Sequence, residues 1–279
     1  MPIHDQSYRR YKGSRENVRS AWTVIATTGM LSLLKKRVFL GVLIGAWIPF
    51  IVRTVQIYVT ANYPQASMFA MKAESFRQFF QQQGIFVFFV TVYVGSGLIA
   101  NDRRANALQI YLSKPMTRAE YVLGKLTILA VFVLLVTLVP GLLLLLLQAL
   151  FSGSFQFVRG HIYLVPAMTL FSLLQAAVVC FTMLALSSLS NSSRFVGILY
   201  AGVVLFSDAV FNTLRGITGS TAMSWLSFPA TLAQLGDLIF RVPLRYTTPP
   251  AVSFIVALAL VAVSVSVLER KVRGVEVIT

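Results

Sequence analysis

The chain has 279 residues, of which 57% are hydrophobic, and it carries a formal net charge of +15. The apolar share lies above the roughly 45–50% that is typical of soluble domains, and the mean hydropathy is +0.76. These values exclude an ordinary soluble domain and indicate a membrane protein.

Six segments are long and apolar enough to cross a bilayer as helices. About 20 residues rising ~1.5 Å each span the ~30 Å hydrocarbon core, and a helix satisfies its own backbone polar groups there. The second segment is the shortest and is expected to extend into its flanks. The predicted spans are residues 38–60, 84–100, 126–150, 162–189, 195–214 and 251–268. The sequence therefore predicts an all-α membrane protein, with a cytosolic segment at 1–37, a six-helix transmembrane domain at 38–268 and a cytosolic tail at 269–279.

The positions of Lys and Arg predict the orientation, because these residues resist translocation and collect in cytoplasmic segments. With both termini cytoplasmic, 17 of the 24 Lys and Arg residues lie in inner segments, six lie in outer ones and Arg53 lies within the first span. We therefore expect a multi-pass protein of the cytoplasmic (inner) membrane with both termini inside. Residues 1–37 begin with a polar, basic segment, so no cleavable signal is predicted. The positive charge is expected to contact anionic lipids and not nucleic acid, since no basic face with interleaved aromatic residues is visible.

Before the first span, residues 17–34 place apolar side chains at helical spacing between basic ends. Such a segment can lie in the cytoplasmic interface with its apolar face toward the lipid. We predict an interfacial helix here, and a simple helical extension below the first span is the alternative.

Between the second and third spans the chain carries a polar stretch with helix signals on both sides of a proline. Ala105, Leu108 and Leu112 share one helical face, so residues 105–113 predict a short amphipathic helix outside the bilayer core. Pro115 stops this helix. The next helix needs its own start signal.

That start signal is a Thr-x-x-Glu capping box at Thr117 and Glu120. In such a box the Thr hydroxyl accepts from an amide of the first turn while the Glu reaches back to the cap. The third membrane helix is therefore expected to begin at Arg118, with Lys125 near the headgroups. A short helix, a rigid corner and a membrane helix form an elbow that would turn a push on the short helix into tilt of the spans.

The elbow also carries a set of residues that recurs in a known family. The set consists of Ala100, Asn101, Asp102, Asn106, Ala107, Leu108, Tyr111, Leu112, Ser113, Pro115, Thr117, Arg118, Glu120, Tyr121, Gly124 and Lys125. It resembles the signature between the second and third spans of ABC-2 type transporter permeases, most closely the branch labelled as multi-copper-enzyme maturation permeases. The resemblance implies a type V exporter-like fold, in which residues 105–113 are the coupling helix seated in a cytosolic ATP-binding subunit. The residues it assigns to that contact are Asp102, Arg103, Arg104, Asn106, Leu108, Gln109, Tyr111, Leu112 and Ser113.

The chain itself carries no phosphate-binding loop. No G-x-x-x-x-G-K-[ST] motif occurs, and Gly124-Lys125 lacks both the upstream glycine and the following hydroxyl. ATP and Mg are therefore expected on a separate ATPase subunit, and this chain is expected to bind no cofactor and to be no enzyme by itself. The resemblance also implies a second permease copy, in a homodimer or a related heterodimer.

The connection at 215–250, expected outside, is long and apolar with several proline breaks. A connection of this kind is expected to pack on or dip into the outer leaflet rather than float in water. We predict short interfacial or re-entrant helices near 221–228 and 230–240.

Two charges fall within the spans, Arg53 in the first and Asp208 in the fifth, and each costs ~2.5–3.5 kcal/mol near the bilayer centre. Their similar depth predicts an ion pair or a shared wet cavity, and snorkelling of Arg53 to the headgroups is the alternative. Tyr93, Ser96 and Asn212 are candidates for lining a pathway between two copies. Hydrogen bonding between helices is the competing explanation for these polar residues.

Other function classes find less support. His4, His161 and Cys180 have no neighbours at metal-ligand spacing, so no metal site is predicted. An intramembrane enzyme would need clustered nucleophiles and bases, and a secondary carrier would need paired acidic residues beside Asp208. We therefore predict the permease subunit of an ATP-driven exporter. The alternative is a mechanotransmitting or lipid-extracting subunit that acts on a partner without classical export.

Overall fold

The computed structural model describes residues 21–107, 117–151 and 159–272, and these parts of the chain are helical and contain no strand. Six helical segments there are long and apolar enough to cross a membrane, and they confirm the six predicted spans. Their bounds are Arg37–Asn62, Ala73–Arg104, Arg118–Phe151, Leu164–Leu189, Ser193–Thr218 and Pro250–Lys271. The second span begins at Ala73, well before its predicted apolar core at 84–100.

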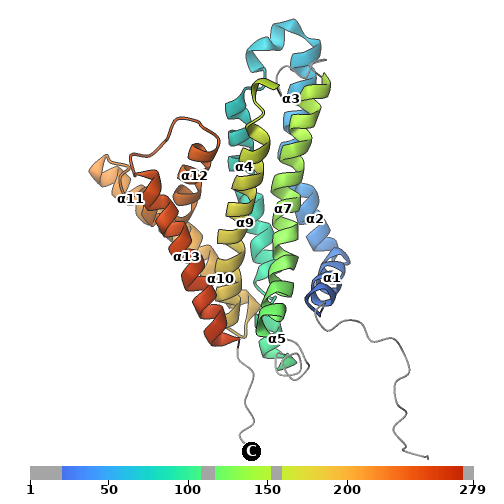
Figure 1. Cartoon of the computed structure of the whole chain (residues 1–279), viewed down its shortest axis with the longest axis vertical. Helices are drawn as coiled ribbons and strands as arrows, with labels where there is room; N and C mark the ends of the chain where they lie inside the picture. Colours follow the sequence, from blue (N-terminus) through green and yellow to red (C-terminus); the bar gives the residue numbers. More distant parts are fainter. Residues whose placement is uncertain (1–20, 108–116, 152–158, 273–279) are drawn as a thin grey trace, which may run out of the picture.

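Four long helices form an upright bundle in Figure 1: α3 (Ile48–Asn62), α4 (Ala73–Gly95), α7 (Arg118–Phe151) and α9 (Leu164–Leu189). The first span is divided, so that α2 (Arg37–Ala46) precedes α3. We call the lower end, with α5 (Ala100–Arg104) and the start of α7, the elbow end. The opposite end, where the chain passes from α3 through η2 (Pro64–Phe69) to α4, is the far end.

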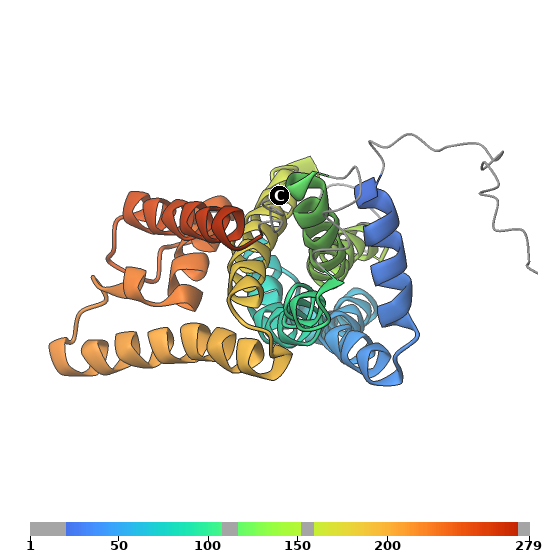
Figure 2. The same cartoon turned by 90° about the horizontal axis from the view of Figure 1, so that it is seen from below.

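The last two spans lean away from this bundle. The fifth span consists of α10 (Ser193–Ala201), the π-helical turn η3 (Gly202–Phe206) and α11 (Ser207–Thr218), and the sixth is α13 (Pro250–Lys271). Seen from below, these two spans extend to one side with α12 (Phe228–Ile239) between them (Figure 2).

The helix α1 (Ala21–Leu34) lies across the bundle axis, as the two views together show (Figures 1 and 2). It packs on α7 at Gly124, where an added Cβ would lie 2.9 Å from the Ile25 Cβ and 3.0 Å from the Trp22 carbonyl oxygen. Only glycine permits this close approach. The orientation of α1 favours the interfacial helix over a straight extension of the first span.

The helix α4 is tied to its neighbours by a buried amide. Pro140 lies inside α7 and has no N–H, so it cannot bond the carbonyl of Val136 four residues earlier. Gln83 of α4 donates to this carbonyl from Nε2 at 2.5 Å and to the Ala46 carbonyl, at the division of the first span, at 3.1 Å. Gln83 is fully buried. One side chain therefore satisfies backbone groups at the irregular points of two other spans.

The connection after α11 contains the two predicted short helices, η4 (Ser224–Leu226) and α12. Ser227 caps α12 by accepting from the Ala230 amide at 3.1 Å, and Pro229 occupies the first turn. After α12, Phe240 packs on Phe80 and Phe171 with ring centroids 5.4 and 5.9 Å away. The helix α12 is therefore buried among α4, α9 and α13 rather than resting on the surface.

Candidate functional site

The second span breaks before it reaches the elbow, at residues 96–99 between α4 and α5. Ser187 of α9 lies against this break and is fully buried. Its hydroxyl accepts from the amides of Ile99 and Ala100, both at 3.1 Å, and donates to the Ser96 carbonyl at 3.0 Å. The hydroxyl satisfies backbone groups that the break releases, and it fixes the angle between α4 and α5.

Asp102 on α5 joins the second span to the third. Its Oδ2 accepts from the Tyr121 hydroxyl at 2.8 Å and lies 2.7 Å from the Lys125 Nζ. Tyr121 is buried and Lys125 is nearly so, which excludes most of the water that would weaken the pair. Arg103 donates to the Ser188 carbonyl at the end of α9. The short helix is therefore held to both α7 and α9.

The predicted capping box is confirmed. The Glu120 amide donates to the Thr117 Oγ1 at 3.2 Å, and the Thr117 amide donates to the Glu120 Oε2 at 2.8 Å. The helix α7 begins at Arg118, as predicted. The corner of the elbow is thus fixed by reciprocal bonds within four residues.

The start of the predicted coupling helix at residue 105 is wrong. Ala105 and Asn106 form a turn, and Asn106 has a φ of 53°, a left-handed conformation that an α-helix does not continue through. Asp102, Arg103 and Arg104 belong to the separate helix α5. The remaining predicted contact residues and the proline corner lie outside the described residues: Leu108, Gln109, Tyr111, Leu112, Ser113 and Pro115.

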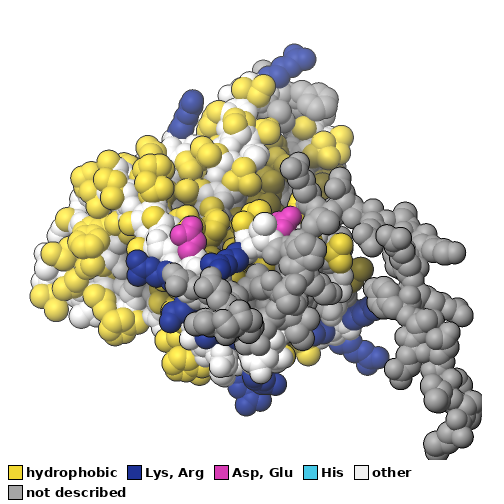
Figure 3. Space-filling model, turned by 60° about the horizontal axis from the view of Figure 1, so that its bottom comes forward, with side chains coloured by type: hydrophobic (Ala, Val, Ile, Leu, Met, Phe, Trp, Pro, Cys, Tyr) yellow, Lys and Arg dark blue, Asp and Glu magenta, His cyan; other side chains and the backbone are white. Residues whose placement is uncertain are grey.

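The elbow end is strongly basic. Figure 3 brings this end forward and shows Lys and Arg side chains gathered on it beside a broad hydrophobic flank. In the described part of the chain these cations lie at the ends of α2, α5, α7, α10 and α13. They are Lys35, Lys36, Arg37, Arg103, Arg104, Arg118, Lys125, Arg194, Arg270 and Lys271.

The predicted ion pair between Arg53 and Asp208 is wrong. Arg53 donates to Gln56 at 2.9 Å and to Gln82 at 3.5 Å, whereas Asp208 accepts from the Ser227 hydroxyl at 2.8 Å. The three ion pairs among the described residues include neither charge, and the pocket that Asp208 lines does not include Arg53. The helices that carry these residues, α3 and α11, lie on opposite sides of the molecule (Figures 1 and 2).

The other polar span residues contact neighbours within the chain. Tyr93 stacks on Phe39 with ring centroids 5.5 Å apart. The Ser96 carbonyl bonds Ser187 at the break, and Asn212 donates to Asp208 at 3.0 Å. Ser96 bonds through its backbone and Asn212 within its own helix, so a pathway role and hydrogen bonding between helices both stay predictions.

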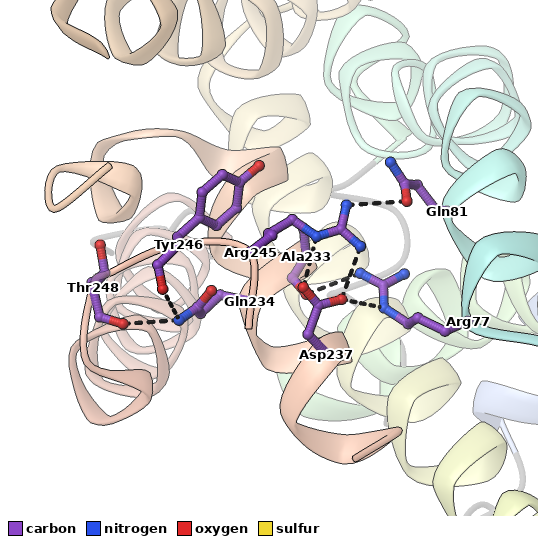
Figure 4. Close-up of polar contacts among 8 residues, drawn as sticks. All are labelled: Arg77, Gln81, Ala233, Gln234, Asp237, Arg245, Tyr246 and Thr248. Atoms are coloured by element: carbon purple, nitrogen blue, oxygen red, sulfur yellow. Dashed lines mark hydrogen bonds and ion pairs between the residues drawn. The ribbon is translucent and has the colours of Figure 1, made fainter. Parts of the chain in front are cut away.

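A buried charge network at the far end was missed from sequence. Asp237 of α12 binds Arg77 of α4 through Nε at 2.8 Å, and it binds Arg245 through Nε at 2.6 Å and Nη2 at 2.9 Å. Arg77 also donates to the Ala233 carbonyl at 2.9 Å, and Arg245 donates to Gln81 at 3.0 Å. Figure 4 shows both guanidinium groups directed at the one carboxylate. Asp237 is 0% exposed, so the network replaces its water shell entirely.

Two neighbouring residues, Gly236 and Tyr246, are directly affected by this network. A Cβ on Gly236 would lie 2.9 Å from both Cζ and Nε of Arg77, so a larger residue would displace the guanidinium. Burial raises the pKa of Tyr246 while the nearby Arg245 lowers it, with burial the larger effect. The available signal in the sequence was Asp237 itself, a lone carboxylate in an apolar helix, because such a buried charge requires a partner.

Residues 15–267 match the model of a family described as ABC-2 family transporter protein. No curated protein matches the chain significantly. In the described part of the chain, no group of three His, Cys, Asp or Glu residues is placed to hold a metal ion.

Proposed function

The chain belongs to the ABC-2 family of transporter proteins, and we propose that it is the membrane-spanning permease subunit of an ATP-binding cassette exporter. In this proposal a separate cytosolic subunit binds and hydrolyses ATP. The observation that carries it is the elbow: a short helix clamped to two spans, followed by a reciprocally capped corner, at a basic end of a six-span bundle.

The clamp explains how force would enter the spans. Asp102 binds Tyr121 and Lys125 of α7, and Ser187 holds the break between α4 and α5. A displacement of the elbow would therefore move α4 and α7 together rather than bend a loose loop. This supports the assignment of the elbow as the receiving element for an ATPase subunit.

The proposal includes orientation and assembly. We propose that the chain lies in the inner membrane with the basic elbow end and both termini in the cytoplasm, because Lys and Arg resist translocation. A second permease copy is expected to pack on the splayed fifth span, whose apolar side chains are exposed; examples are Phe195, Ile198, Leu205 and Phe206. The multi-copper-enzyme maturation branch rests on the sequence signature alone.

Copurification from native membranes tests the proposal. A tagged wild-type chain should retain a protein with a phosphate-binding loop, identified by mass spectrometry. The variant Leu108→Asp/Leu112→Asp should insert normally and lose that protein. Leu244→Asp is the matched control, since Leu244 is exposed on the connection beyond α12. The proposal fails if the wild type retains no ATPase, or if the Leu244→Asp variant loses it and the elbow variant keeps it.

Thiol labelling tests the orientation independently. Cys180 is the only cysteine in the sequence and is buried, so the wild-type chain should not react with the reagent. A cysteine at Arg104 should react with a membrane-impermeant maleimide only after the inner face is opened. A cysteine at Arg241 should react in intact cells. The reverse pattern would place the elbow on the wrong side for an ATPase.

A second candidate is force transmission to an external partner without export. The observation that favours it is the bond between Arg77 and Asp237, which ties α12 to the same helix α4 whose other end passes into the elbow. Tilt of α4 would then move the far-end connection. Limited proteolysis would distinguish this candidate from export. If force is transmitted, ATP should make α12 more accessible to protease even when no substrate is transported.

A further inference from the structure

A pocket in two continuous parts opens between the bundle and the splayed fifth span. The polar part, of about 200 Å³, is lined by both arginines of the buried network and by Asp208. The apolar part, of about 460 Å³, follows α4 and the turn η3. Gln81, Gly84, Gln175 and Pro229 line both parts. Both parts together have the volume of an ordinary ligand pocket, ~300–1,000 Å³.

The two parts are ordered along the membrane axis. On α4, Arg77 lines the polar part and Phe88 the apolar part, so the polar part lies nearer the far end. The fifth span runs in the opposite direction, and there Val204 lines the apolar part before Asp208 lines the polar part. Two antiparallel spans therefore indicate the same order of the polar and apolar parts along the membrane axis. The pocket is polar toward the membrane surface and apolar toward the interior, which is the order of a lipid in one leaflet.

The polar part carries one unmatched charge of each sign. Arg77 and Arg245 share the single carboxylate of Asp237, which leaves one net positive charge in the network. Asp208 contributes a negative charge and accepts only from neutral groups, a serine hydroxyl at 2.8 Å and an asparagine amide at 3.0 Å. No cation among the described residues lies within ion-pair distance of Asp208. A ligand with both charges would complement both sides.

A buried amide at the junction also lacks a partner. Gln175 of α9 is 6% exposed and lines both parts of the pocket. Its Oε1 has no hydrogen-bond partner among the described residues. A buried carbonyl oxygen without a partner destabilises the protein, because it has lost its hydrogen bonds to water. An ammonium group carries three N–H donors, so one that faces Asp208 in the polar part could also donate to this oxygen, because Gln175 lines the same part.

We propose that this pocket binds a zwitterionic phospholipid, with the phosphate at Arg245, the ammonium at Asp208 and one acyl chain in the apolar part. The second chain lies in the surrounding bilayer, because Ile85, Phe89 and Leu205 of the apolar part are exposed on the surface of the chain. The π-helical turn η3 forms part of the acyl wall, and such turns recur at functional sites. Binding needs no ATP-binding subunit, so its failure would leave the proposed transport function standing.

Native mass spectrometry of the purified full chain in detergent tests this site. The probes are phosphatidylethanolamine and phosphatidylglycerol, which share the phosphate and differ in the ammonium. The wild type should bind phosphatidylethanolamine more tightly. Asp208→Asn should weaken phosphatidylethanolamine by roughly tenfold, since one hydrogen bond between charged groups contributes about that factor. The same variant should leave phosphatidylglycerol binding unchanged, which shows that it is folded.

Arg245→Gln should weaken both lipids, and Arg241→Gln is the matched control. Arg241 lies on the same connection and packs over the Tyr163 ring at 5.1 Å, outside the pocket. A phosphatidylethanolamine with a photoreactive acyl chain should label residues of α4 or η3 in the apolar part. Soluble glycerophosphoethanolamine should not displace the lipid, because it lacks the chain. Equal lipid affinities in the wild type, an equal effect of both arginine variants, or labelling confined to other surfaces would overturn the proposal.

Discussion

Replacing Asp237 with Asn removes the one carboxylate that two guanidinium groups share. Asp237 and the Arg77 side chain are 0% and 4% exposed, so water cannot take the place of the lost charge. Removing one partner of a buried ion pair costs about 3–5 kcal/mol. Three hydrogen bonds from charged donors end on this carboxylate, each contributing ~1.5–3 kcal/mol but not additively. The variant should therefore lose about 4 kcal/mol of stability.

The apparent melting temperature of the purified chain in mild detergent measures this loss. A change of about 1 kcal/mol shifts the melting temperature of a chain of this size by roughly 2–4 °C, so Asp237→Asn should melt roughly 8–16 °C lower. The double variant Arg77→Met/Asp237→Leu should melt higher than Asp237→Asn. It removes the buried charges together, and the remaining Arg245 side chain is 31% exposed and reaches water.

Arg241→Met is the control for loss of a cation on the same connection. Arg241 is exposed and joins none of the ion pairs among the described residues, so its replacement should change stability by less than about 0.5 kcal/mol. The reasoning is refuted if Asp237→Asn melts within about 2 °C of the wild type. It is also refuted if the double variant melts as low as Asp237→Asn.

Three further changes test the elbow and its support. Ser187→Ala leaves three backbone groups at the break unsatisfied and should cost about 1–3 kcal/mol in thermal unfolding; Ser188→Ala, whose hydroxyl bonds only within α9, should cost less, and equal losses would contradict the hinge role. Glu120→Ala removes half of the capping box and should cost about 0.5–2 kcal/mol, measured as faster amide hydrogen exchange in the first turn of α7; unchanged exchange would argue against the cap. Gly124→Leu should push α1 off α7 and expose it to limited proteolysis, and a protected α1 would show that the close approach is dispensable.

The features that depend on local sequence could be predicted. The six spans follow from apolar length against a fixed bilayer thickness, and all six are present. The capping box follows from two residues three positions apart, Thr117 and Glu120, because its bonds form within one turn. The two short helices before the last span follow from proline breaks in an apolar segment.

Contacts between distant segments could not be predicted in the same way. Arg53 and Asp208 were matched by depth, but depth does not fix the direction in which a helix faces. Arg77 and Asp237 are 160 positions apart, and the sequence predicts both in outer connections, so no local pattern joins them. The sequence predicts Asp102 at the contact with a partner, whereas its carboxylate binds Lys125 within the chain. These contacts depend on which face each helix turns toward its neighbour.

The buried Gln83 also bears on how the protein is made. The chain is synthesised from its amino terminus, so α4 reaches the membrane before α7. The Val136 carbonyl, which Pro140 cannot bond, thus enters a bilayer that already contains its donor, Gln83. A bare carbonyl facing lipid costs several kcal/mol, so α7 has a thermodynamic reason to dock beside α4 as it leaves the translocon. Biogenesis of the third span is in this way coupled to the earlier presence of the second.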